Sequence, residues 1–188
     1  MRTSKSKTLM DLLLMEDDPM LIYGIATETH LLYFLEDIER IIRQSREYRS
    51  WVFIKKYKHK QTICKAIGID VADYEGIHIQ QHHWPISLYD ICLIVGMKMI
   101  SLLKEQEYVT TFDIASQVIK EHLSKDNLIG SVSLLTSYHE MYHSGIQILN
   151  KEDINGNYQQ FIEKYKEYIP TAVKERIDYN LKEGNSKI

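Results

Sequence analysis

The sequence is poor in the residues that hold small secreted domains together. It contains two cysteines among 188 residues, Cys64 and Cys92, and neither belongs to a CxxC pair. A disulfide framework and a zinc ribbon are therefore not expected, and the chain is typical of a reducing compartment. Because no run of about 18 apolar residues occurs, the sequence predicts no membrane span.

An excess of positive charge is also lacking, since the formal net charge is −3. Any nucleic-acid site must therefore come from local clustering of Lys and Arg. The apolar segment from Thr8 to Met15 follows a basic start, but Asp11 interrupts it, so it makes a poor signal peptide. We expect a cytoplasmic protein. Richness in Ile, Lys and Tyr with few prolines is typical of an AT-rich genome, such as that of a phage.

Hydrophobic periodicity predicts a mostly helical chain, and 44% of the residues are hydrophobic, enough for a core. Ser87 with Asp90, and Thr110 with Asp113, have the spacing of helix start signals. Alternating apolar residues predict short strands over 76–82 and 129–134. The expected helices are 29–48, 51–69, 87–103, 110–123, 138–143, 158–169 and 171–183.

Histidines are concentrated at the ends of these predicted elements. His82 and His83 end the first strand, and His139 and His143 lie in the short helix that follows the second strand. Residues at i and i+4 lie one turn apart on one helix face, so His139 and His143 can share a metal ion. His30, His59, His78 and His122 show no partner pattern and are expected to be structural or exposed.

A strand that ends in His-His, a second strand and a helix with His-x3-His together resemble the HNH superfamily of nucleases, especially its colicin-like branch. The resemblance covers residues 76–84 and 129–145. It implies that His82, His139 and His143 bind one divalent metal ion (Mg²⁺, Mn²⁺, Ni²⁺ or Zn²⁺). It also implies that His83 is the general base, which a neutral imidazole can be at physiological pH.

The chain departs from the family pattern at one position. The family has an asparagine nine residues before the first helical histidine, where it holds the loop that positions the base. This chain has Gly130 there, with Asn127 and Ser131 nearby as substitutes. The CxxC structural zinc of many relatives is also missing.

Two alternatives remain. His139-Glu140-x-x-His143 also matches the zincin signature, with Glu140 as base and Glu163 or Glu167 as third ligand. The zincin motif lies within a long helix, however, and gives His82 and His83 no role. The other alternative is a catalytically inactive HNH-derived module that binds nucleic acid or protein.

The segment from Arg40 to Lys65 is the basic part of the chain, with nine Lys or Arg and one acidic residue. Basic residues interleaved with aromatics suit phosphate contacts and base stacking, although an ordinary solvated helix face has the same composition. The residues that we expect to contact nucleic acid are Arg43, Arg46, Arg49, Lys55, Lys56, Lys58 and Lys60.

Taken together, these patterns predict an α+β fold that is mostly helical, with a small ββα-metal centre interrupted by a helical insertion. We expect a basic helical region over 1–70, the HNH-like core over 71–150 with its insertion at about 86–128, and a helical extension over 151–188. The predicted function is metal-dependent hydrolysis of nucleic-acid phosphodiester bonds, with DNA as the expected substrate and no membrane partner.

Overall fold

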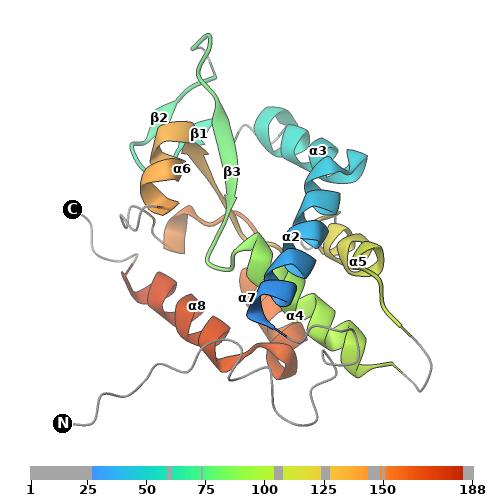
Figure 1. Ribbon diagram of the computed structural model, residues 1–188. Helices are drawn as coiled ribbons and strands as arrows, with labels where there is room; N and C mark the ends of the chain where they lie inside the picture. The colour runs from blue at the N-terminus through green and yellow to red at the C-terminus, as the bar shows by residue number, and fades with distance from the viewer. Residues whose placement is uncertain are drawn as a thin grey trace, which may run out of the picture.

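A computed structural model describes residues 27–58, 61–72, 74–103, 108–123, 128–143, 149 and 151–183. The fold is α+β and mostly helical, as predicted (Figure 1). The elements in chain order are α2 (Glu28–Gln44), α3 (Arg46–Phe53), the π-helical turn η2 (Ile54–Lys58), β1 (Ile63–Cys64), β2 (Ile69–Asp70), β3 (Ile79–His83), α4 (Leu88–Ser101), α5 (Thr111–Leu123), β4 (Ser131–Leu135), α6 (Thr136–His143), η3 (Lys151–Asp153), α7 (Tyr158–Tyr165), η4 (Lys166–Tyr168) and α8 (Thr171–Glu183).

The helix start signals in the sequence act as expected. The Ser87 side chain accepts a hydrogen bond from the Asp90 amide at 3.0 Å, which caps α4. At α5 the capping is reciprocal, because Thr110 Oγ1 accepts from the Asp113 amide while the Asp113 carboxylate accepts from the Thr110 amide. Each pair satisfies backbone donors that a helix N-terminus leaves without intrahelical partners. The predicted starts of both helices are confirmed.

The strands β3 and β4 form an antiparallel pair, with a register that runs from Ile79 opposite Leu135 to His83 opposite Ser131. Helix α6 begins at Thr136, directly after β4, and packs against both strands. A small core of seven buried residues surrounds this unit: Cys64, Val71, Ile79, Trp84, Val132, Leu134 and Leu149. The predicted order of strand, helical insertion, strand and helix is thus the order in the structure.

The prediction of a helix over 51–69 is wrong in its second half. Helical structure continues through η2 to Lys58, but Ile63–Cys64 and Ile69–Asp70 form an antiparallel hairpin. Gly68 has a φ of 70°, a left-handed conformation that glycine adopts at no steric cost and that ends a helix. The Lys65 amide also donates to the Ser133 carbonyl at 2.9 Å, so this segment lies against β4.

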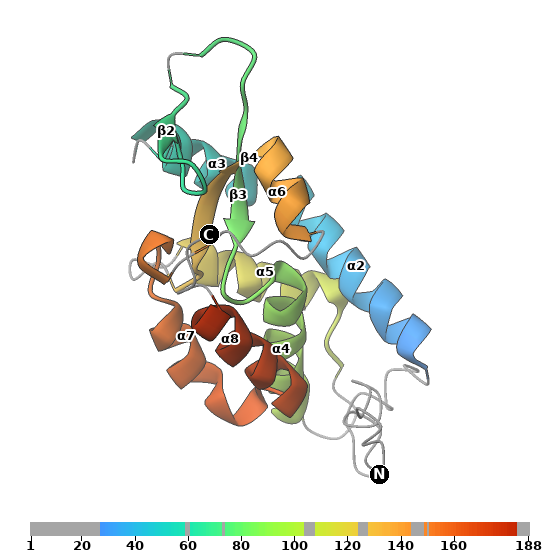
Figure 2. The same cartoon turned by 90° about the vertical axis from the view of Figure 1, so that its left-hand side faces the viewer.

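The remaining helices form a larger apolar core below the sheet. In both views the strands and α6 occupy the upper part of the molecule, whereas α4, α7 and α8 gather in the lower part (Figures 1 and 2). Both cysteine thiols are buried, since Cys92 lies in this core and Cys64 in the smaller one. Within the described residues, no helix combines the length and apolar character that a membrane span needs.

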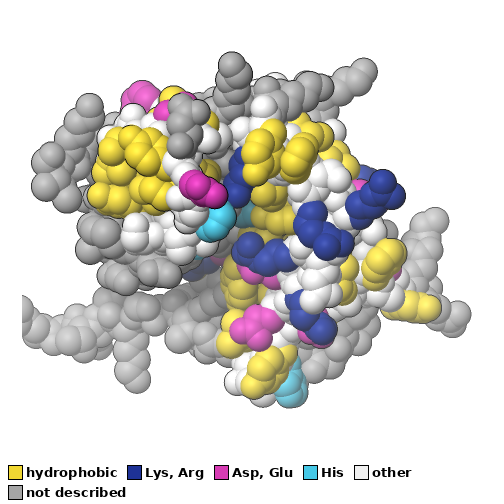
Figure 3. Space-filling model, turned by 90° about the horizontal axis from the view of Figure 1, so that it is seen from above, with side chains coloured by type: hydrophobic (Ala, Val, Ile, Leu, Met, Phe, Trp, Pro, Cys, Tyr) yellow, Lys and Arg dark blue, Asp and Glu magenta, His cyan; other side chains and the backbone are white. Residues whose placement is uncertain are grey.

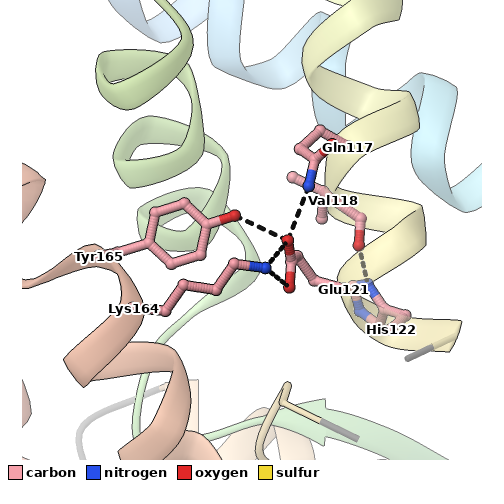
Figure 4. Close-up of polar contacts among 6 residues, drawn as sticks. All are labelled: Gln117, Val118, Glu121, His122, Lys164 and Tyr165. Carbon is pink, nitrogen blue, oxygen red and sulfur yellow. Dashed lines mark hydrogen bonds and ion pairs between the residues drawn. The ribbon is translucent and has the colours of Figure 1, made fainter. Parts of the chain in front are cut away.

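Polar anchors fix the C-terminal helices to this core. The buried Glu121 carboxylate of α5 accepts hydrogen bonds from Lys164 at 2.7 and 2.8 Å, from the Tyr165 hydroxyl at 2.8 Å and from Gln117 at 2.7 Å (Figure 4). Because a buried carboxylate is costly without partners, this network holds α7 against α5. The next residue of α5, His122, is not part of this network; its Nδ1 contacts the Val118 carbonyl (Figure 4), and its Nε2 contacts His83 at the end of β3.

Candidate active site

The ββα unit brings two of the predicted metal ligands together. His82 comes from β3 and His139 from α6, and their ring centroids lie 4.9 Å apart at an interplanar angle of 72°. His82 is buried and His139 is half-buried. Residues separated by 57 positions in the sequence thus meet because β3 pairs with β4 and α6 follows β4 directly.

This separation suits two ligands of one metal ion. Imidazole nitrogens bind Zn²⁺ at about 2.0–2.1 Å, so the ring centroids of two tetrahedral ligands lie roughly 5 Å apart. The third predicted ligand, His143, is the last residue of α6 and lies one turn beyond His139; its side chain is outside the described residues. Among the side chains that are described, no group of three or more metal-binding types is found. Of the three predicted ligands, His82 and His139 are the two whose described side chains lie together.

The predicted base, His83, is in a different environment from its neighbour. It is only 5% exposed, and the rings of Tyr48 and Trp51 stack on it at centroid distances of 6.1 and 6.0 Å. Burial lowers the pKa of His83 well below 6.5, and the nearby His122 and Arg43 lower it further. The imidazole is therefore neutral at physiological pH, the state that a general base requires.

His122 is the site residue that sequence reasoning missed, since it was expected to be structural or exposed without a partner. It is 2% exposed, and its Nε2 lies 2.9 Å from His83 Nε2. Its Nδ1 lies 2.9 Å from the carbonyl oxygen of Val118. A signal for it exists in the sequence: His122 shares a helix face with Ile114 and Val118, and a histidine on an apolar face needs a polar partner.

We expect the stability of the fold to fall in mild acid because of His122. Burial lowers its pKa from 6.5 to about 4. Between these values the unfolded chain binds a proton that the folded chain does not, so stability present above pH 6.5 is lost as the pH falls toward 4. The loss is about 3 kcal/mol, at about 1.4 kcal/mol per pKa unit.

Urea unfolding at pH 7.5, 5.5 and 4.5 measures this effect when wild type is compared with His122→Gln, which has no titrating ring. The wild type should lose more stability than the variant over this range. Parallel losses in the two proteins would show that His122 does not titrate in this way.

A pocket of about 230 Å³ opens beside the histidines. Viewed from above, a hollow that holds a histidine side chain separates an apolar cluster from a group of Lys and Arg side chains (Figure 3). Arg43 is the basic residue of the pocket lining, and it forms an ion pair with Glu39 at 3.3 Å. The lining residues are Glu39, Arg43, Gln81, His82, His83, Ser87, Leu88, Tyr89 and His139.

Of the other predicted nucleic-acid contacts, none whose side chain is described lines this pocket. Arg46 and Arg49 line a separate, larger hollow on α3, together with Ser50, Phe53 and Ile54. Lys55 is buried, with its ammonium group 5.6 Å from the centre of the Trp51 ring, so it supports the aromatic cluster rather than the surface. Lys56 is half-buried, and burial lowers its pKa. The side chains of Lys58 and Lys60 lie outside the described residues.

The structure explains why glycine occupies the position of the family's asparagine. A Cβ atom at Gly130 would lie 2.4 Å from the carbonyl oxygen of Trp84 and 3.2 Å from Ile154 and Tyr158 side-chain atoms. The Trp84 amide also donates to the Gly130 carbonyl at 3.2 Å, which extends the strand pairing past His83. Of the two substitutes, Ser131 is fully buried and pairs with Asn155, and Asn127 lies outside the described residues.

Among the side chains that the structure describes, the groups needed by the zincin alternative do not form a cluster. Helix α6 starts directly after a strand, so the His-Glu-x-x-His segment lies in a short helix rather than within a long one. Glu163 is exposed and pairs with Lys166 at 2.8 Å, and Glu167 is exposed as well. The side chain of Glu140 lies outside the described residues.

The site belongs to a protein with a small ββα unit set among helices. A family model described as bacteriophage G278-like virion protein matches residues 4–188, so the chain belongs to this family. No curated protein and no solved structure matches the chain. The family assignment is compatible with the phage origin that the composition suggested.

Proposed function

We propose that this chain is a metal-dependent nuclease of the HNH type that hydrolyses phosphodiester bonds, with DNA as its substrate. The observation that carries the proposal is the arrangement around one pocket: the rings of His82 and His139 are in edge contact, and the neutral His83 and the cationic Arg43 line the same pocket. These groups are a pair of metal donors, a base and a phosphate-binding cation. As a member of a virion protein family, the chain would act on nucleic acid in the particle or in the cytoplasm after delivery.

His82 and His139 would hold the divalent ion, with His143 as the third ligand that the resemblance implies. When bound, such an ion polarises a phosphoryl oxygen and stabilises the leaving oxygen. His83 takes a proton from water, since burial keeps its ring neutral. Arg43 binds the phosphate in the same pocket, and its pairing with Glu39 holds the guanidinium there until the substrate competes for it.

The burial of His83 favours a second candidate, a module that binds nucleic acid without cutting it. At 5% exposure, the predicted base presents little of its ring to a substrate. A panel of supercoiled plasmid, linear duplex, single-stranded DNA and RNA separates the two functions, with binding and cleavage measured on each. Cleavage of any member supports the nuclease, and binding without cleavage by metal-loaded protein supports the second candidate.

Replacing either facing histidine should weaken metal binding. We expect His82→Ala and His139→Ala each to lower the affinity for Zn²⁺ or Ni²⁺ by more than about 100-fold, since loss of an outer-shell partner alone costs about 10–100-fold. Isothermal titration calorimetry measures the affinity. His30→Ala is the matched control, because His30 is exposed in the first turn of α2 and should have no effect. Equal affinities in all four proteins would mean that the pair is not a metal site.

Replacing Arg43 should weaken DNA binding through the loss of one phosphate contact. Arg43→Ala is expected to reduce the slope of log affinity against log salt by about one, with little dependence on DNA sequence. Fluorescence anisotropy in EDTA measures binding without cleavage. Arg40→Ala is the control, since Arg40 lies one turn earlier on α2, pairs with Asp37 and is not part of the pocket lining. If Arg43→Ala and Arg40→Ala both keep the wild-type slope of log affinity against log salt, Arg43 does not contact a phosphate.

A further inference from the structure

Helix α5 of the insertion lies against the end of β3 and brings a second imidazole to the predicted base. His122 Nε2 and His83 Nε2 are 2.9 Å apart, a hydrogen-bonding distance, and both rings are buried. The rings meet nearly edge to face, at an interplanar angle of 86°. Nothing in the HNH resemblance assigns a role to His122, because it lies in the insertion between the two strands.

The hydrogen bonds of His122 determine which nitrogen of His83 carries a proton. A carbonyl oxygen only accepts, so His122 Nδ1, at 2.9 Å from Val118 O, must be the protonated nitrogen of its ring. In a neutral ring, His122 Nε2 is then an acceptor. His83 Nε2 must therefore donate to it, which leaves His83 Nδ1 with a lone pair. Burial lowers the pKa of His122 to about 4, so its ring is neutral at physiological pH.

Among the described residues, no hydrogen bond is found for His83 Nδ1. His83 lines the pocket beside His82 and His139, and within the described part of the chain its hydrogen bond is the one that Nε2 makes. Tyr48 and Trp51 stack nearly parallel to the His83 ring, at interplanar angles of 19° and 13°. The stacked rings fix the plane of the imidazole, and His122 fixes its rotation and tautomer.

We propose that His122 is the positioning residue for His83, accepting the Nε2 proton so that Nδ1 faces the pocket as the base. This inference rests on the proposed nuclease function. In the reaction, a water O–H bond breaks and its proton goes to His83 Nδ1, while the water oxygen bonds to phosphorus. The bond from phosphorus to the leaving sugar oxygen breaks, and that oxygen takes a proton from solvent. His83 later returns its extra proton to solvent.

This role replaces what the family's asparagine does. Gly130 cannot carry a side chain, because its Cβ would meet the Trp84 carbonyl, so position 130 supplies no side chain that could hold the base. The inserted helix supplies one instead, from across the aromatic cluster of Tyr48 and Trp51, whose rings also contact His122 edge-on at 5.3 and 4.9 Å.

Two variants at one position separate positioning from packing. His122→Phe fills the space without an acceptor, whereas His122→Gln keeps an acceptor oxygen. We expect His122→Phe to lower kcat for DNA cleavage about 10–100-fold with KM and Zn²⁺ affinity unchanged, as losses of supporting hydrogen bonds do. We expect His122→Gln to remain within a few-fold of wild type. Equal kcat in wild type and a folded His122→Phe would overturn the inference while the nuclease function stands.

The tautomer of His83 can be measured without any DNA cleavage. Nitrogen-15 NMR of ring-labelled wild-type protein should show His83 protonated at Nε2 and not at Nδ1, and His122→Gln should keep this pattern even if His122→Phe fails to fold. A wild-type His83 protonated at Nδ1 would overturn the inference. Failure of the wild type to cleave any substrate with any metal would refute the proposed function, and the role of His122 as an aid to catalysis would fall with it, whatever the tautomer.

Discussion

Gly130→Asn, which restores the residue of the family pattern, is expected to lower the free energy of unfolding by about 3 kcal/mol or more, and not to raise activity. The new Cβ would lie 2.4 Å from a backbone oxygen, that of Trp84, and this contact is relieved only by moving the strand end that carries His83. Forcing atoms into a packed site is among the few mechanisms that give effects of this size. Urea unfolding monitored by circular dichroism measures it.

Gly76→Asn is the matched control for this prediction. Gly76 has a φ of 78°, which asparagine tolerates better than most residues, and no atom lies within 4 Å of its would-be Cβ. Its cost should stay within about 1 kcal/mol. If Gly130→Asn is as stable as Gly76→Asn, the close approach of the Trp84 carbonyl does not constrain the position, and the absence of asparagine has another cause.

His83→Ala is expected to lower the rate of DNA cleavage by about 10²–10⁴-fold, the usual contribution of a general base. Metal affinity should hardly change, because the facing pair is His82 and His139. The rate is measured as conversion of supercoiled to nicked plasmid over time. His78→Ala removes an exposed histidine just before β3 and should retain wild-type activity.

The outcome for His83→Ala also separates the alternatives. If the chain is a zincin, its activity depends on Glu140 and is unchanged by His83→Ala. If it is a non-cutting module, the His83→Ala variant keeps both its nucleic-acid binding and its fold. A variant that cleaves as fast as wild type would remove His83 from the mechanism. Because the variant leaves His122 without its partner in a buried site, its unfolding should be measured alongside.

Local signals predicted most of the architecture. Ser87 with Asp90, and Thr110 with Asp113, set helix starts that the structure confirms, because capping depends on residues three apart. The strand ending at His82-His83 was predicted from alternation alone. The β1–β2 hairpin was missed, since its strands are two residues long and give no periodic pattern.

The site was predicted only where chain order and strand pairing define it. His82 and His139 come into contact because β3 pairs with β4 and α6 follows β4 directly. The spacing of the histidines in the sequence indicated this order of strand, strand and helix. The His83–His122 contact depends on how the inserted helix α5 packs, and no local pattern reports that packing. The requirement for glycine at position 130 arises in the same way, from a carbonyl 46 residues away in sequence. Nor could sequence separate Arg43, which lines the pocket, from Arg46 and Arg49, which line another hollow.

The most direct test of the central claim is cleavage of supercoiled plasmid by the purified wild-type protein with Mg²⁺, Mn²⁺, Ni²⁺ or Zn²⁺, each beside a matched sample in EDTA. A nuclease centre built from His82, His83 and His139 predicts nicking with at least one metal and none in EDTA. Folded protein that binds metal yet leaves the plasmid supercoiled in every sample would contradict it.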